Sequence, residues 1–155
     1  DYPDFIARLA NEAGFDCALI MLEITESRLI KEMTSALEVL TRLRMKGFGL
    51  SIDDFGTGYS SMEQLQRLPF TELKIDRAFV HGAQHDAKAR AILESSADLG
   101  RRLGMRIVAE GVEEDGDLAC VGAMGCDVVQ GFIVSRPMAA IGFNAWLADW
   151  KSGNG

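Results

Sequence analysis

The sequence predicts a single α/β domain with parallel strands, and three observations lead to this prediction. The chain has 155 residues, of which 48% are apolar and 25% charged, so it is long and apolar enough to bury one hydrophobic core. Short apolar segments rich in β-branched residues alternate with segments of helical periodicity. These units recur roughly every 20–35 residues, as βα units do. Composition and spacing leave open both a doubly wound sheet and part of a (β/α)8 barrel.

Five segments are predicted to be strands. Each is short and mostly apolar, as expected where both faces of a parallel sheet are covered. No glycine-rich dinucleotide motif or P-loop follows the first of them, which disfavours a nucleotide-binding Rossmann domain. The five segments are Cys17–Thr25, Phe48–Asp53, Glu72–Asp76, Arg106–Gly111 and Asp127–Phe132.

Six helices are predicted around these strands, most of them followed by a glycine or a proline. The longest runs from about Asp86 to Leu103, with Gly104 as its C-cap. A short helix opens with a capping box that begins at Ser60, and Pro69 closes it. The other four are expected over Asp4–Ala13, Thr34–Lys46, Asp117–Met124 and Phe143–Trp150.

Charge and metal-binding residue types narrow the class of function. The net charge of −7 argues against a broad basic face for DNA or RNA, so an anionic ligand needs a bound cation to attract it. The three cysteines include no CxxC pair, which favours buried thiols in a reducing cytoplasm over a disulfide framework. His81 and His85 lie four residues apart, but no further histidine or cysteine is near them, which disfavours a zinc site.

Every predicted strand carries a polar or charged residue near its C-terminal end, on the face opposite its main apolar residues. In α/β folds with parallel strands, these ends are where sites form. A charge that faces the interior is costly unless it is paired or bound to a metal ion. We therefore expect one common polar site that contains Glu23, Asp53, Asp54, Lys74, Glu110 and Gln130.

These residue types favour metal chemistry. Clustered hard oxygen ligands suit Mg²⁺ or Mn²⁺. The adjacent Asp53 and Asp54 can hold a two-metal centre, with Asp53 bridging, of the kind that hydrolyses phosphodiesters. Lys74 would then orient the attacking hydroxide or offset charge on the phosphate. A Schiff-base role for Lys74, as in an aldolase, is an alternative, although surrounding acids raise the pKa of a lysine and keep it charged.

Six segments together resemble a known family. LEITES, DDFGTGYSS, LKIDRAFV, VAEGVE, GCDVVQGF and SRPM occur in the order and at the spacing of the EAL domain family of bacterial cyclic di-GMP phosphodiesterases. The resemblance spans essentially the whole chain. It implies a TIM-like (β/α) barrel, often dimeric, that opens cyclic di-GMP to linear pGpG with Mg²⁺ or Mn²⁺.

The resemblance also implies roles for the metal-binding residues. Glu23 and Asp53 look like ligands of a first metal ion, and Asp53, Asp54 and Glu110 look like ligands of a second. Lys74 resembles the residue that orients the attacking water. The resemblance assigns Glu110 both to the metal ligands and, with Lys74 and Gln130, to the catalytic residues.

Further residues match the family's substrate and loop positions. Gln130 resembles a residue close to the attacking water and the substrate, and Asp76 a residue that contacts the substrate. Glu26 resembles the glutamate that anchors the loop after Asp54. By resemblance, this mobile loop links metal binding to dimer contacts, and it includes Phe55, Gly56, Thr57 and Gly58.

The chain departs from the family at its N-terminal end. The strand with the Glu-Ala-Leu motif and a later strand with a metal-binding asparagine are both missing from the sequence. We therefore expect residues 1–155 to be an EAL domain that lacks its N-terminal strands, an incomplete barrel of five βα units. An upstream sensory or response-regulator domain is expected in the parent protein, which is cytoplasmic or membrane-anchored.

Two functions remain open within this family. One is an active phosphodiesterase, and the other is a catalytically inactive EAL-like sensor that binds cyclic di-GMP and signals to a partner. Every diagnostic site residue that falls inside this chain is present, and degenerate sensors usually lose some of these acids. The sequence therefore favours the enzyme, acting as a homodimer.

Overall fold

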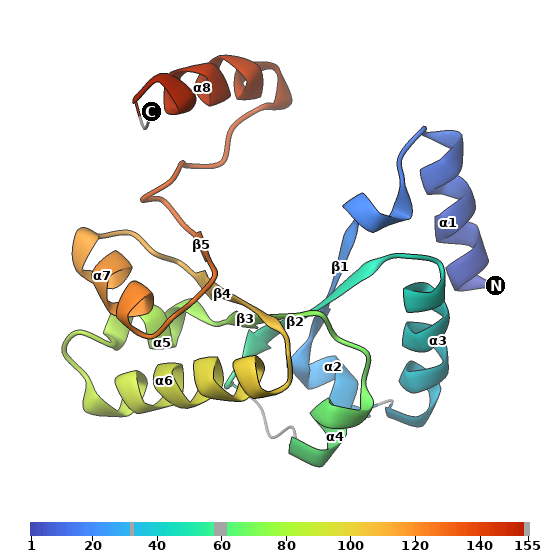
Figure 1. Ribbon diagram of the computed structural model, residues 1–155, viewed down its shortest axis with the longest axis horizontal. Coiled ribbons are helices and arrows are strands. Elements are labelled where there is room, and N and C mark those ends of the chain that lie inside the picture. The colour runs from blue at the N-terminus through green and yellow to red at the C-terminus, as the bar shows by residue number, and fades with distance from the viewer. Residues whose placement is uncertain (32, 58–61, 154–155) are drawn as a thin grey trace.

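The computed structural model describes residues 1–31, 33–57 and 62–153. Within these ranges, five strands form one parallel sheet (Figure 1). Each strand pairs with the next one along the chain, so the order across the sheet is β1-β2-β3-β4-β5. The strands are β1 Met21–Thr25, β2 Gly49–Phe55, β3 Glu72–Ile75, β4 Arg106–Glu110 and β5 Val128–Gln130.

The helices surround this sheet in the alternating pattern that the sequence predicts. Six of them lie within about three residues of the predicted bounds, although the predicted start of α4 at Ser60 falls outside the described residues. The six-residue helices α2 and α5 were not predicted. The helices are α1 Tyr2–Glu12, α2 Glu26–Lys31, α3 Met33–Met45, α4 Met62–Arg67, α5 Arg77–Gly82, α6 Ala87–Arg102, α7 Asp115–Ala123 and α8 Ala140–Gly153.

The strand order decides between the two candidate architectures. A doubly wound sheet reverses its strand order at a switch point, whereas this sheet runs in sequence order throughout. The alternate strand residues that face α3 and α6 are fully buried, and they include Leu50, Leu73 and Ile107. An added Cβ at Gly100 of α6 would lie 2.1 Å from Ile107 Cδ1, so this helix rests directly on the sheet. The arrangement is that of part of a (β/α) barrel.

The first predicted strand is too long at its N-terminal end. Residues Cys17–Leu19 form a short 3-10 helix, η1, and β1 begins only at Met21. The Asp16 carboxylate accepts a hydrogen bond from Ala18 N at 2.9 Å and caps this turn. A short apolar run does not distinguish a strand from a helical turn, and this local side-chain bond favours the turn.

The two outer strands leave apolar surfaces at both sides of the sheet. Beside β1 lies a groove of about 640 Å³, and Leu22, Ile24 and Leu40 contribute to its lining. Beyond β5, Figure 1 shows α8 apart from the sheet, and none of its described residues is buried. The described residues thus form an open sheet with uncovered apolar surface near each edge.

Cys17, Cys120 and Cys126 are free thiols, so these three residues form no disulfide. Burial raises the pKa of Cys126 to about 11, which keeps this thiol protonated and unreactive near neutral pH. No helix in the described part of the chain has the length and apolar character needed to cross a bilayer.

Candidate metal centre

Lys74 lies at the centre of the polar face of the sheet. Its side chain is only 5% exposed, and its Nζ atom contacts carboxylates from three other strands. The distances are 2.9 Å to Glu23 Oε1, 3.1 Å to Asp53 Oδ1 and 2.7 Å to Glu110 Oε1. One buried ammonium group therefore joins acids from β1, β2 and β4.

The surroundings of Lys74 keep it charged. Burial alone would lower its pKa, but the hydrogen bonds to Glu110, Glu23 and Asp53 outweigh that effect and raise the pKa above its ordinary value. A lysine must lose its proton to form a Schiff base. The structure therefore disfavours the aldolase alternative and supports a role for Lys74 as a fixed positive charge.

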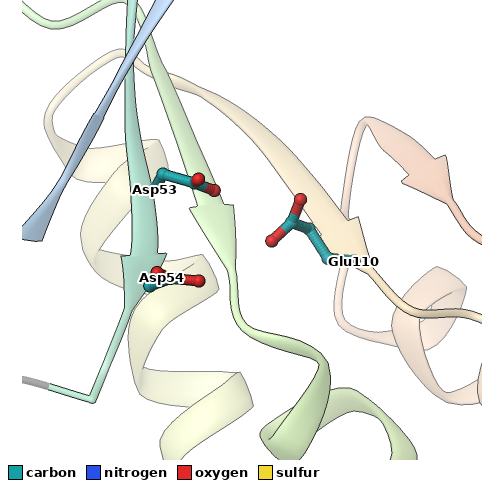
Figure 2. Close-up of side chains that lie close together, drawn as sticks. All are labelled: Asp53, Asp54 and Glu110. Atoms are coloured by element: carbon teal, nitrogen blue, oxygen red, sulfur yellow. The ribbon is translucent and has the colours of Figure 1, made fainter.

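An irregularity in β2 brings two adjacent carboxylates to the same side of the sheet. Neighbouring residues of a regular strand point to opposite faces, but the pairing between β2 and β3 shifts register between Ile52 and Phe55. Asp54, within this irregular stretch, has a left-handed backbone with φ of 56°. Figure 2 shows the side chains of Asp53 and Asp54 directed into the same space, with the Glu110 carboxylate opposite them on β4.

These three carboxylates are spaced as ligands of one divalent cation are. Asp53, Asp54 and Glu110 each offer an oxygen, and these oxygens all lie within 4.8 Å of one another. Hard oxygen ligands around Mg²⁺ or Mn²⁺ need this proximity. No other such group of acids, histidines or cysteines occurs among the residues the structure describes.

Lys74 does not fully offset the negative charge and burial of this cluster, because the pKa values of two of its carboxyl groups are raised. Burial, followed by the charges of Asp53 and Asp76, raises the pKa of Asp54. Burial also raises the pKa of Glu110, although Lys74 acts in the opposite direction. Carboxylates that resist ionisation in this way are stabilised by a bound cation. The donor set therefore fits a divalent metal ion.

Other predicted site residues surround the cluster. Glu23 is not part of the three-carboxylate group but shares the ammonium of Lys74 with it. Gln130 pairs with Glu110 in the sheet register and is exposed. Asp76 caps the N-terminus of α5, where its Oδ1 atom accepts a hydrogen bond from Ala78 N at 2.7 Å.

The predicted loop begins with a fixed backbone. Gly56 N donates a hydrogen bond to Glu26 Oε2 at 3.1 Å, and the Glu26 side chain is almost fully buried at 2% exposure. Phe55 is buried as well, and Thr57 Oγ1 donates to the Asp54 carbonyl at 2.8 Å. Gly56 has φ of 101°, a conformation that favours glycine. Gly58 lies outside the described residues.

The loop after Glu110 is held by a contact that the sequence did not predict. Val112 N donates to the Gln130 carbonyl at 3.2 Å, and Ile133 N donates to the Val112 carbonyl at 3.0 Å. Between these bonds, an added Cβ at Gly131 would lie 2.1 Å from Val112 O and 2.5 Å from Val112 N. Only glycine allows the two backbones to approach so closely.

Gly131→Ala is therefore expected to lower the free energy of unfolding by about 1–3 kcal/mol, the usual cost of forcing a methyl group into a packed site. Urea denaturation measures this loss. Gly122→Ala in α7 is the matched control, because its added Cβ meets no atom within 4 Å and alanine favours a helix. Equal stability of the two variants would contradict the close contact at Gly131.

Comparison with known proteins identifies the family. The sequence profile of the EAL domain matches residues 1–137. The chain belongs to the EAL domain family. Its sheet is accordingly part of the TIM-like barrel of EAL domains, in agreement with the sequence-based prediction.

Two characterised relatives of this EAL chain come from Pseudomonas aeruginosa. The bifunctional diguanylate cyclase/cyclic di-GMP phosphodiesterase MucR is 46% identical over 121 residues, which are 78% of this chain and 18% of MucR. The cyclic di-GMP phosphodiesterase RocR is 41% identical over 133 residues, which are 86% of this chain and 34% of RocR. This chain thus spans about a fifth to a third of the length of these relatives.

Solved EAL structures have the same fold. The PaMucR phosphodiesterase in complex with c-di-GMP matches with a TM-score of 0.87 and 41% identity, over 90% of this chain and 57% of that one. The manganese/c-di-GMP complex of Klebsiella pneumoniae BlrP1 matches with a TM-score of 0.81 and 32% identity, over 86% of this chain and 34% of that one.

Proposed function

We propose that this chain contributes the metal-binding half of an EAL domain that hydrolyses cyclic di-GMP to linear pGpG. The observation that carries the proposal is the group of Asp53, Asp54 and Glu110 oxygens within 4.8 Å of one another, beside the buried ammonium of Lys74. An inactive cyclic di-GMP sensor has no need of these four residues together. The assembled acids therefore favour hydrolysis over sensing.

The proposed metal ions are Mg²⁺ or Mn²⁺. Asp53, Asp54 and Glu110 would hold one ion, and Glu23 and Asp53 would contribute to a second. The bound ions would supply Lewis-acid stabilisation of charge on the phosphodiester and its attacking water. Relatives of this chain include a protein solved with manganese and cyclic di-GMP, which supports this choice.

The chain's own residues have separate tasks in the proposed reaction. Lys74 would stay protonated and would turn one of the three N–H groups that now contact carboxylates toward the attacking water, holding it in line with the scissile P–O bond. Asp76 directly follows β3, the strand of Lys74, and Gln130 ends β5, the strand beside that of Glu110. Both residues would contact the substrate. The loop at Phe55–Thr57 would transmit metal binding from Asp54 to a second subunit of a homodimer.

We further propose that strands upstream of this chain complete the barrel. The apolar groove beside β1 and the uncovered helix α8 lie on the two sides of the open sheet, where the remaining strands of a barrel would pack. Relatives such as the oxygen sensor protein DosP of Escherichia coli support a sensory domain further upstream. The proposed location is the cytoplasm, where this second messenger acts.

The test compares two polypeptides for hydrolysis of cyclic di-GMP, with Mn²⁺ and with EDTA. One is this chain, and the other, the extended polypeptide, also includes the upstream residues through the Glu-Ala-Leu strand. We expect pGpG only from the extended polypeptide and only with Mn²⁺. Binding of cyclic di-GMP without cleavage would favour the sensor, and hydrolysis in EDTA would overturn the metal centre.

A further inference from the structure

A second buried carboxylate lies away from the metal centre, at the third residue of α7, where it forms a capping box with Glu114. Asp117 of α7 has no exposed surface. Its two oxygens accept from Gln84 Nε2 at 3.1 Å, from Glu113 N at 3.3 Å and from Glu114 N at 3.4 Å, and one of them lies 3.3 Å from His81 Nδ1. Four polar contacts on one carboxylate are enough to offset the cost of burying it.

These contacts keep Asp117 ionised. Burial acts to raise its pKa, but the hydrogen bonds from Gln84, Glu113, His81 and Glu114 outweigh burial and hold the pKa below its ordinary value. A neutral amide has one acceptor oxygen, and its NH₂ group would face the donors. The site is therefore built for a carboxylate.

The partners of Asp117 come from two segments that flank the metal centre. His81 belongs to α5, the helix that follows Lys74 on β3, and Gln84 lies just after that helix. Glu113 and Glu114 belong to the loop that connects Glu110, at the end of β4, to α7. Asp117 thus links the element after Lys74 to the loop after Glu110.

The loop after Glu110 and the segment that contains α5 are in close van der Waals contact. Gly111, which directly follows Glu110, has φ of 67°, and an added Cβ there would lie 2.3 Å from Arg77 Cβ at the start of α5. An added Cβ at Gly116 would lie 2.2 Å from Gln84 Oε1. A shift of this loop would therefore carry the backbone of Glu110 with it.

We propose that Asp117 is a positioning residue for the metal centre. It holds the β4–α7 loop against α5 and thereby fixes the distance between the Glu110 carboxylate and the carboxylates of Asp53 and Asp54. The inference rests on the proposed function, because it assigns Asp117 a task in that same metal site. Residues that hydrogen-bond a metal ligand directly commonly change metal affinity about 10- to 100-fold when replaced. Asp117 acts through the loop backbone instead, so we expect the lower end of that range.

The test titrates Mn²⁺ into the extended polypeptide and follows both bound Mn²⁺, by electron paramagnetic resonance, and the rate of cyclic di-GMP hydrolysis. Asp117→Asn is the main variant. Asp98→Asn is the matched control, since Asp98 is an exposed acid on α6 that pairs with Arg102 on the same helix. We expect Asp117→Asn to require about 10-fold more Mn²⁺ for half-saturation, with a kcat at saturating Mn²⁺ close to that of the parent, and Asp98→Asn to change neither.

Hydrogen exchange at the Glu113 and Glu114 amides reports whether the loop contact is lost, and the Mn²⁺ midpoint separates positioning from general stability. We expect Asp117→Asn to lose protection at these two amides. A lower melting temperature with an unchanged Mn²⁺ midpoint would overturn the positioning role and leave Asp117 a structural residue. If the parent itself bound no Mn²⁺, the proposed function would fail, and this inference with it. Asp117→Glu, which restores the charge, should recover part of the Mn²⁺ affinity.

Discussion

Replacing Lys74 with methionine is expected to lower the free energy of unfolding of the extended polypeptide by about 3 kcal/mol in EDTA, and Mn²⁺ should recover most of this loss. Removing one partner of a buried ion pair typically costs about 3–5 kcal/mol, because the remaining charge is left uncompensated. We expect the lower end, since the Glu23 side chain is 48% exposed and water screens its charge. Asp53 and Glu110 carry most of the effect.

The recovery by Mn²⁺ is the informative part of this experiment. Among the described residues, Lys74 is the cation in contact with these carboxylates, and Lys74→Met removes it. A divalent ion would replace the missing positive charge. Urea denaturation with EDTA and with Mn²⁺ measures both states. Lys46→Met is the control, since Lys46 pairs with Asp4 on the surface, and its denaturation midpoint should not depend on Mn²⁺. Equal losses with and without Mn²⁺ would argue against a metal centre at Lys74.

Asp54→Asn is expected to reduce hydrolysis at least about 100-fold, and at the same time to stabilise the metal-free protein. Metal ions contribute several kcal/mol to the stabilisation of developing charge, and each 1.36 kcal/mol corresponds to a tenfold change in rate. The stability gain has a different origin. The carboxylate of Asp54 is partly buried near Asp53 and Asp76, and asparagine accepts the left-handed backbone at this position.

The sign of the stability effect follows from the pKa. Because the pKa of Asp54 is raised in the folded chain, its charged form is destabilising above that pKa, and this penalty disappears as the pH falls toward the unfolded value of 3.8. In EDTA, the melting temperature of Asp54→Asn should exceed that of the parent near neutral pH. Solvent screens this partly exposed carboxylate, so we expect less than the shift of about 2–4 °C that about 1 kcal/mol produces in a domain of this size. The difference should vanish near pH 4. A lower melting temperature at neutral pH would contradict the charge repulsion.

The sequence predicted the strands well because alternation and β-branched runs are strong local signals. It also predicted that acids end the strands. It did not predict why Asp53 and Asp54 face the same side, because the register shift of β2 depends on the pairing with β3 and not on the residues of β2 alone. Local pattern thus predicts which residues form the site, and tertiary pairing determines how they are directed.

The elements that the sequence missed are short or depend on distant partners. Helices α2 and α5 have six residues each, too few to show a helical period. The equally short α4 was predicted only because a capping-box pattern and Pro69 flank it. Asp117 forms a local capping box with Glu114, but its contacts with Gln84 and His81 are 33 and 36 positions away, and the local motif gives no sign of them. The prediction of a strand at Cys17–Leu19 was wrong although the signal is local. Asp16 caps a 3-10 turn there, but the apolar residues that follow it also fit a strand.

The sequential strand order also has a consequence for biosynthesis. Because each strand pairs with its immediate predecessor, the sheet can grow one strand at a time as the polypeptide leaves the ribosome, without waiting for distant segments. The acidic turn of β2 emerges early, while its counter-charge Lys74 arrives later with β3. The nascent chain therefore passes through a stage in which Asp53 and Asp54 have been synthesised and the ammonium group of Lys74 has not.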